Sequence, residues 1–145
     1  MEHVAIMKKS WGLTKKILSG EKKIESRWHI SKHSPWDRIN KDDIVFFKDS
    51  GEPVSIKTKV DSVMQFSDLT PEKVMEILIK YGKVDGINIK DIKEYYERFK
   101  NKNYCILVFL KNSQKIKPFG INKKGFGIMS AWLTVDNITK IKLKN

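Results

Sequence analysis

The stretch "ILSGEKKIESR", residues 17–27, joins the end of a predicted helix to the start of a predicted strand. Gly20 follows the last apolar residues of helical spacing, where glycine commonly ends a helix. The residues after it alternate in polarity, as strands do. Side chains on a strand point alternately to its two faces, so Glu25 and Arg27 share one face and Ile24 lies on the other. Because Ile24 is apolar, the face with Glu25 and Arg27 is predicted to look outward or into a polar cleft.

Lys22 has the wrong parity to join that face if the strand is already regular there. It can do so only if it still belongs to the turn after Gly20. Spacing alone favours a simpler interpretation, an exposed ion pair between Glu25 and Arg27 that contributes under about 1 kcal/mol.

Apolar periodicity predicts the other elements of the chain. Thr70 and Pro71 are typical of a helix start, Gly82 of its end, and Ser10 is predicted to cap the first helix. Strands are expected at 3–9, 22–28, 42–49, 54–66, 103–112 and 130–143, helices at 10–20, 71–81 and 88–101, and a loop at 115–129. Residues 42–49 and 54–66 should pair as a hairpin.

The order β-α-β-β-β-α-α-β-β predicts an α+β fold, a small mixed β-barrel with flanking helices. It does not predict a doubly wound sheet, because helices do not separate every strand pair. No linker or repeat divides the sequence, so residues 1–145 are expected to form a single domain.

The charge of the chain points to a polyanionic partner. There are 29 lysines and arginines against 17 acids, which gives a net charge of +12. Only three of these bases are arginines, and lysine neutralises phosphate without reading base edges. The composition therefore favours affinity for a nucleic-acid backbone, and a solvated basic surface is the alternative.

The opening stretch resembles the G-x-K-x-x-E-x-R signature of ASCH domains. The similarity continues through "INKDDIVFFKDSG", where Asp42 stands in place of the usual glycine, and through "PFGINKKGFGIMSAWL". The resemblance implies a PUA-like fold and RNA binding. It implies that Lys22, Glu25 and Arg27 lie at a cleft that holds RNA or a nucleotide, with a structural role for Glu25 and Arg27 as the alternative.

Other candidate binding residues flank this motif in the expected fold. Trp11 follows a basic turn and is the first choice for stacking a base, and Trp132 is the second. Trp28 shares the face of Ile24 and is expected to be packed. The remaining candidate contacts to the ligand are Lys9, Ser10, Lys123, Lys124 and Ser130.

An enzyme is the alternative function. Some ASCH proteins are amidohydrolases that deacetylate a modified cytidine with a lysine, a threonine and a glutamate, and others are described as ribonucleases. Lys22 matches the lysine, but Glu25 occupies the threonine position, and Asp91 is only a loose counterpart of the acid. Binding is therefore preferred, with Lys22, Glu25 and Asp91 as the catalytic candidates of a hydrolase.

Several other classes of protein are not indicated. His29 and His33 are four residues apart, but nearby Pro35 argues against a helix, so no metal site is predicted. No phosphate loop or dinucleotide motif occurs, and no cofactor is expected. Cys105 lies in an apolar run and is expected to pack as a small hydrophobe. Without an apolar stretch of about 18 residues or a secretory signal, the protein is expected to be cytoplasmic, with no membrane partner.

Overall fold

Six strands and three helices form the chain in this computed structural model, which describes residues 1–144. The strands are β1 (Glu2–Met7), β2 (Ile24–His29), β3 (Ile44–Asp49), β4 (Val54–Phe66), β5 (Tyr104–Phe119) and β6 (Trp132–Val135). The helices are α1 (Leu13–Ser19), α2 (Pro71–Tyr81) and α3 (Ile92–Phe99), with the short 3₁₀ turns η1 (Lys9–Trp11), η2 (Ile89–Asp91) and η3 (Ile138–Lys140).

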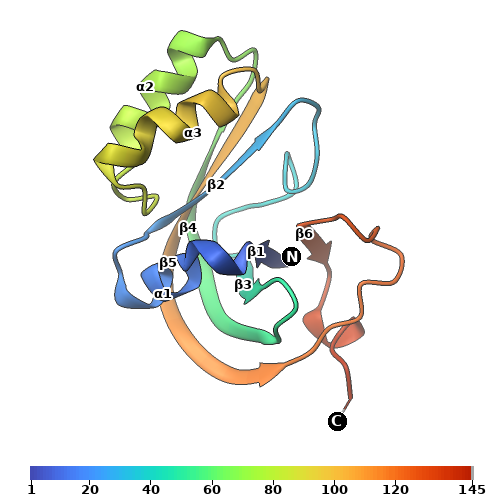
Figure 1. Cartoon of the computed structure of the whole chain (residues 1–145). Helices are drawn as coiled ribbons and strands as arrows, with labels where there is room; N and C mark the ends of the chain where they lie inside the picture. Colours follow the sequence, from blue (N-terminus) through green and yellow to red (C-terminus); the bar gives the residue numbers. More distant parts are fainter. Residues whose placement is uncertain (145) are drawn as a thin grey trace.

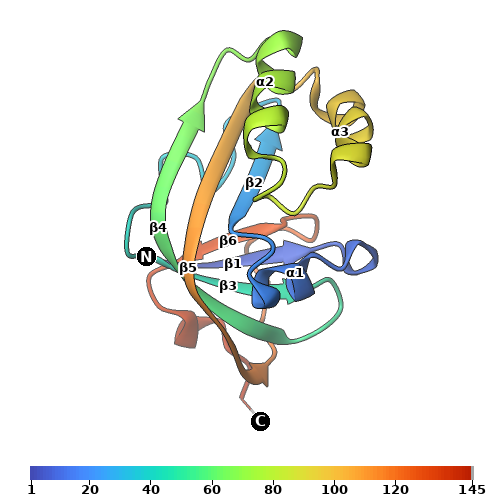
Figure 2. The same cartoon turned by 90° about the vertical axis from the view of Figure 1, so that its left-hand side faces the viewer.

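The long antiparallel strands β4 and β5 form the centre of the molecule. They belong to a six-stranded sheet with the order β2-β5-β4-β3-β1-β6, in which β1 and β3 are parallel and the other neighbours are antiparallel. The sheet curls into a half barrel, with α2 and α3 packed at one end (Figures 1 and 2).

The predicted α+β fold and the predicted element order are confirmed. Strands β3 and β4 pair as the expected hairpin. The Thr70 hydroxyl accepts a hydrogen bond from the Lys73 amide at 3.2 Å, which caps α2 as predicted. Gly20 ends α1 with a φ of +83°, a left-handed conformation that glycine adopts without strain.

Three local predictions are wrong. Ser10 lies within the 3₁₀ turn η1, and Gly12 takes the N-cap position of α1 with no side-chain hydrogen bond. Residues 115–119 extend β5 instead of beginning a loop, because they pair with β4 as far as Phe119. The last predicted strand is only four residues long, and the chain then turns through η3.

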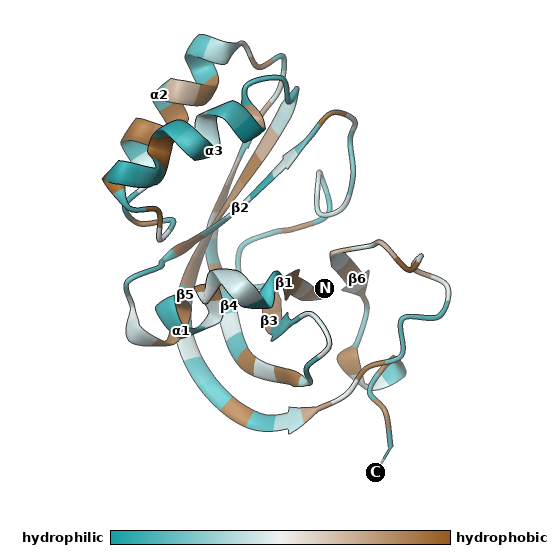
Figure 3. Ribbon diagram, in the orientation of Figure 1, coloured by the Kyte–Doolittle hydropathy of each residue, from teal (hydrophilic) through white to brown (hydrophobic). Residues whose placement is uncertain are grey.

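The burial pattern of β5 explains how one sheet supports two cores. Ile106 and Val108 pack on one face with Leu13 and Ile17 of α1. The alternate residues of β5 pack on the other face against α2 and α3. Val74, Ile77 and Leu78 of α2 belong to this second core, and Figure 3 shows brown apolar and teal polar segments alternating along α2, as expected for an amphipathic helix. A third cluster packs β1, β3 and β6 against the C-terminal turn.

The two edge strands of the curled sheet are β2 and β6. They leave an open seam between β2 on one side and the β1–β6 pair on the other, because β2 pairs with neither β1 nor β6. Cys105 is buried, as expected. Across residues 1–144, no helix has the length and hydropathy needed to cross a membrane.

Candidate functional site

Lys22 occupies a tight turn between α1 and β2. Its amide donates to the Lys16 carbonyl at 2.9 Å, and β2 begins only at Ile24. Lys22 therefore lies outside the strand register, which satisfies the condition for its side chain to meet Glu25. Its Nζ lies 3.2 Å from Glu25 Oε1 and 2.5 Å from Asp85 Oδ1, and it donates to the Asp85 carbonyl at 2.7 Å.

Glu25 and Arg27 share a face of β2, and their side chains meet. Arg27 Nη2 donates to Glu25 Oε2 at 2.9 Å. The side chains of Glu25 and Arg27 are only 5% and 14% exposed, so the interpretation as an exposed ion pair is wrong. The pair lies at the seam of the half barrel because β2 is an edge strand.

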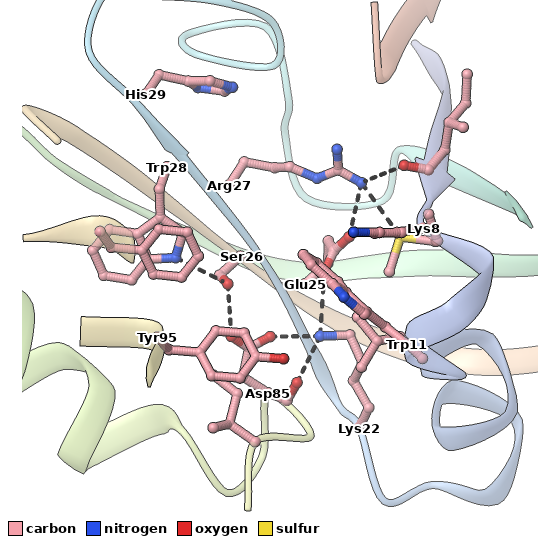
Figure 4. A pocket seen from close by; sticks show the side chains of 15 residues that line it. Lys8, Trp11, Lys22, Glu25, Ser26, Arg27, Trp28, His29, Asp85 and Tyr95 are labelled. Carbon is pink, nitrogen blue, oxygen red and sulfur yellow. Dashed lines mark hydrogen bonds and ion pairs between the residues drawn. The ribbon is translucent and has the colours of Figure 1, made fainter. Parts of the chain in front are cut away.

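Asp85 joins the same cluster from the loop after α2. The Ser26 hydroxyl donates to Asp85 Oδ2 at 2.6 Å, and Trp28 Nε1 donates to Ser26 Oγ at 3.2 Å. Figure 4 shows Lys22 between the two carboxylates, with Ser26 on the far oxygen of Asp85. Two bases, two acids and one hydroxyl are thus joined at the start of β2.

The pKa values in this cluster reflect competition between burial and charge. Burial alone would lower the pKa of Lys22, but Asp85 and Glu25 outweigh it and raise that pKa. Burial alone would raise the pKa of Glu25, but Lys22 and Arg27 outweigh it and lower that pKa. Burial raises the pKa of the Asp85 carboxyl, and the charge of Glu25 adds to the effect against the opposing charge of Lys22. Lys22 is therefore held protonated and Glu25 ionised, while Asp85 is the group best suited to accept a proton.

A cavity of about 230 Å³ opens over this cluster. Polar groups of Lys22, Glu25, Ser26 and Asp85 line one part of it. Aromatic rings of Trp11, Trp28, Tyr95 and Phe99 line another part. In Figure 4, the Tyr95 ring and the Trp11 indole lie beside the ion pair of Lys22 and Asp85.

The rings of this cavity differ in how firmly they are held. Trp28 stacks on Phe99 with a centroid distance of 4.8 Å and an interplanar angle of 6°. Trp11 is 39% exposed, and the Arg98 guanidinium lies 4.7 Å from its ring centroid. Trp28 is therefore part of the core, as predicted, while Trp11 is a ring at the mouth of the cavity.

Arg27 bridges the open seam of the half barrel. Its guanidinium donates across to the Ile6 carbonyl at 3.4 Å and to the Ala131 carbonyl at 3.3 Å. It also lies 5.2 Å from the ring centroid of Trp132. One side chain of β2 therefore contacts β1 and the segment that leads into β6.

A second cavity, of about 500 Å³, lies along the same seam. Arg27 and His29 line both cavities, so the two spaces share a wall. The loop after β2, the segment that leads into β6 and β6 itself bound the rest of the second cavity. The lining residues there are His33, Ser34, Arg38, Gly125, Phe126, Met129, Ser130, Ala131, Trp132 and Thr134.

The structure distributes the candidate residues among three places. Trp11, Lys22, Glu25 and Arg27 line the first cavity. Ser130 and Trp132 line the second cavity together with Arg27. The residues that line neither cavity are Lys9, Ser10, Asp91, Lys123 and Lys124.

Two of these outlying lysines already have partners. Lys9 Nζ pairs with Glu52 at 2.5 Å. Lys123 Nζ donates to the carbonyls of Ile128 at 3.1 Å and Ser130 at 2.8 Å, so it holds its own loop together.

Sequence reasoning missed Ser26, Asp85, Tyr95 and Arg38. The position of Asp85 in a turn had a local signal, because an Asp-Gly pair after the helix end at Gly82 is typical of a turn. Asp91, the expected counterpart, lies in η2, and Asp85 is the acid that contacts Lys22 together with Glu25.

The curled mixed sheet with its packed helices is an α+β half barrel (Figure 1). Solved ASCH-domain structures have the same fold, as the resemblance in the sequence predicted. The ASCH protein from Zymomonas mobilis is similar with a TM-score of 0.64 at 16% identity, over 96% of this chain and 91% of that chain. A point mutant of that protein gives a TM-score of 0.66 at 16% identity, over 96% and 93%. The hypothetical protein PH0355 gives 0.53 at 20% identity, over 80% of this chain and 100% of that chain. No protein-family model and no curated protein matches the sequence.

Proposed function

We propose that residues 1–145 form a single domain that binds RNA or a nucleotide in the first cavity. The observation that carries the proposal is the first cavity itself, which combines a buried charged cluster with exposed aromatic surface in a chain of net charge +12. The ASCH resemblance independently implies RNA binding.

The charged cluster offers a ligand more acceptors than donors. Lys22 directs its ammonium at three acceptors, Glu25 Oε1, Asp85 Oδ1 and the Asp85 carbonyl, which matches its three N–H groups. It is therefore engaged in holding the two carboxylates. Carboxylate oxygens retain further lone pairs, and these suit the amino and imino N–H groups of a nucleobase.

Aromatic rings at the mouth of the cavity supply a stacking surface for that base. Trp11 and Tyr95 lie close together, with centroids 6.4 Å apart at an angle of 68°. A volume of about 230 Å³ suits a single base rather than a larger ligand. The proposed pose has the base on Trp11 with its polar edge toward Glu25.

The proposal is tested by measuring binding of nucleosides and short RNAs to the Trp11→Ala variant. Stacking on one ring contributes about 1–3 kcal/mol, so affinity should fall roughly 5- to 150-fold. The Ile79→Ala variant removes another exposed apolar side chain, on α2 and outside the cavity, and should bind as the unchanged protein does. Equal binding by both variants would contradict the pose.

A second candidate function is hydrolysis in the same cavity. The observation that favours it is the Ser26 hydroxyl, which donates to Asp85, a carboxyl whose raised pKa suits a general base. Ser26 Oγ would attack the acyl carbon or the phosphorus while Asp85 takes its proton, and Asp85 would return that proton to the leaving amine or 5′-hydroxyl as the bond to it breaks. Water would then hydrolyse the acyl- or phosphoryl-serine and free Ser26. Lys22 stays protonated and would stabilise negative charge.

Turnover separates this candidate from simple binding. N-acylated nucleosides and short RNAs are incubated with the protein, and products are separated by chromatography. A hydrolase gives product with the unchanged protein and none with Ser26→Ala, which should still bind. No product from the unchanged protein excludes this function for those substrates.

A further inference from the structure

We propose that the second cavity binds the phosphate of the nucleotide whose base occupies the first cavity. This inference rests on the proposed function and specifies the ligand as a phosphorylated nucleotide or an RNA strand, not a free nucleoside. The two cavities would act as adjoining subsites of one site.

The side chains around the second cavity are those that bind phosphate. Two of the three arginines of the chain, Arg27 and Arg38, line it with His29, His33 and Ser34. Arginine suits phosphate because its planar N–H groups can donate two parallel hydrogen bonds. No carboxylate is among the described residues that line this cavity.

Arg38 differs from the other two arginines of the chain in having no counter-ion among residues 1–144. Arg27 pairs with Glu25, and Arg98 pairs with Glu94. Arg38 is exposed, and within residues 1–144 no acidic group lies within ion-pair distance of it. Its positive charge is therefore available to an anion from solution.

The lowered pKa of His29, which lies on the wall shared by the two cavities, agrees with a positive potential there. Partial burial lowers the pKa of His29 to about 4, and the charges of His33, Arg27 and Lys102 contribute to the shift. No carboxylate is among the groups that move this pKa. A bound phosphate would supply the missing negative charge.

The shared wall makes the two cavities neighbours, as the base and the phosphate of one nucleotide require. Arg27 lines both cavities, and its Nη2 donates to Glu25 of the first cavity. A base against Glu25 and a phosphate beyond Arg27 would therefore lie on opposite sides of one guanidinium. The second cavity, at about 500 Å³, has room for a phosphate with its attached sugar.

The test compares nucleosides with their 3′- and 5′-monophosphates and with dinucleotides, by calorimetry at one low salt concentration. A charge-assisted contact to arginine is expected to make the best monophosphate bind about tenfold tighter than its nucleoside. Arg38→Ala should remove most of that increment and leave nucleoside affinity unchanged. Trp11→Ala should weaken both ligands by the same factor.

Lys115→Ala is the matched control, because it removes one exposed positive charge from β5 outside both cavities. It should preserve the increment. A dinucleotide that binds tighter than either monophosphate indicates a strand as the source of the phosphate, and equal binding indicates a mononucleotide; both support the subsite.

The inference and the proposed function fail in different ways. If nucleosides bind but the phosphate adds nothing, or if Arg38→Ala weakens nucleoside and monophosphate equally, the phosphate subsite is wrong and base binding stands. If no nucleoside, nucleotide or RNA binds, the proposed function is wrong and this inference falls with it.

Discussion

Lys22 holds two carboxylates together at the start of β2. Its side chain is 2% exposed, and its ammonium is directed at three acceptors, two of them on Asp85. It keeps two acids at fixed positions where they would otherwise repel each other. A buried charge of this kind is costly to leave unpaired.

Replacing Lys22 with methionine is therefore expected to destabilise the fold. Lys22→Met keeps the length of the side chain but leaves two buried carboxylates facing each other. The free energy of unfolding should fall by about 3 kcal/mol, the lower end for a broken buried ion pair, because Glu25 retains Arg27. Urea unfolding at neutral pH measures the change.

Lys140→Met is the matched control for this change. Lys140 pairs with Asp136 at 2.9 Å, but both side chains are exposed. The unfolding midpoint should scarcely move, because surface pairs contribute little. Similar losses for the two variants would show that burial of Lys22 adds nothing.

His29 gives a prediction about pH. Its pKa is about 4 in the folded protein and 6.5 when unperturbed. As pH falls from 6.5 toward 4, the unfolded chain takes up a proton at His29 and the folded protein does not, so the folded state loses stability over that window. Urea midpoints between pH 7 and pH 4 should fall less steeply in His29→Gln than in the unchanged protein. Identical slopes would contradict the shifted pKa.

The elements that were predictable from sequence are those whose start is marked by residues within a single turn. Thr70 and Pro71 start α2 because the cap and the fixed φ act within one turn. Ser10 failed as a cap because Gly12 redirects the chain between η1 and α1. The full length of β5 depends on pairing with β4, which lies far away in sequence, so no local pattern marks its end.

Contacts between elements explain what was missed at the site. Strand parity on β2 was enough to place Glu25 beside Arg27. It could not place Asp85, which is 63 residues from Lys22 and reaches it only through the packing of α2 and α3 on the sheet. It also could not show that both charged side chains of β2 would be buried at a seam.

The seam gives a prediction about β2 as an element. Arg27→Ala removes the bridge to β1 and to Ala131, and it leaves Glu25 with Lys22 alone. Stability should fall by about 2 kcal/mol, the size of a hydrogen bond to a charged group. Hydrogen exchange should become faster in β2 and β1, with α2 unaffected.

Arg98→Ala tests whether this effect is specific to the seam. Arg98 pairs with Glu94 on the surface of α3, and its loss should cost under about 1 kcal/mol. If Arg27→Ala lowered the free energy of unfolding by no more than Arg98→Ala does, a structural role for Arg27 at the seam would be wrong.

At the scale of the whole molecule, the net charge of +12 acts at long range and the two cavities act at short range. In the proposed complex, the net charge would attract the polyanion, and the two cavities would fix the positions of its base and its phosphate. Salt would weaken the long-range attraction strongly, and it would weaken binding in the cavities only where a phosphate is contacted.

Salt titration of short-RNA binding separates the two parts. The logarithm of the association constant should fall linearly with the logarithm of salt concentration, by about 0.7 for each phosphate contacted on a single strand. Arg38→Ala should reduce that slope by about 0.7, since it removes one proposed phosphate contact. Trp11→Ala should lower affinity at every salt concentration without changing the slope, because stacking releases no counterions. A flat titration of the unchanged protein would mean that its positive charge has no part in binding, and an Arg38→Ala slope equal to it would place the phosphate elsewhere.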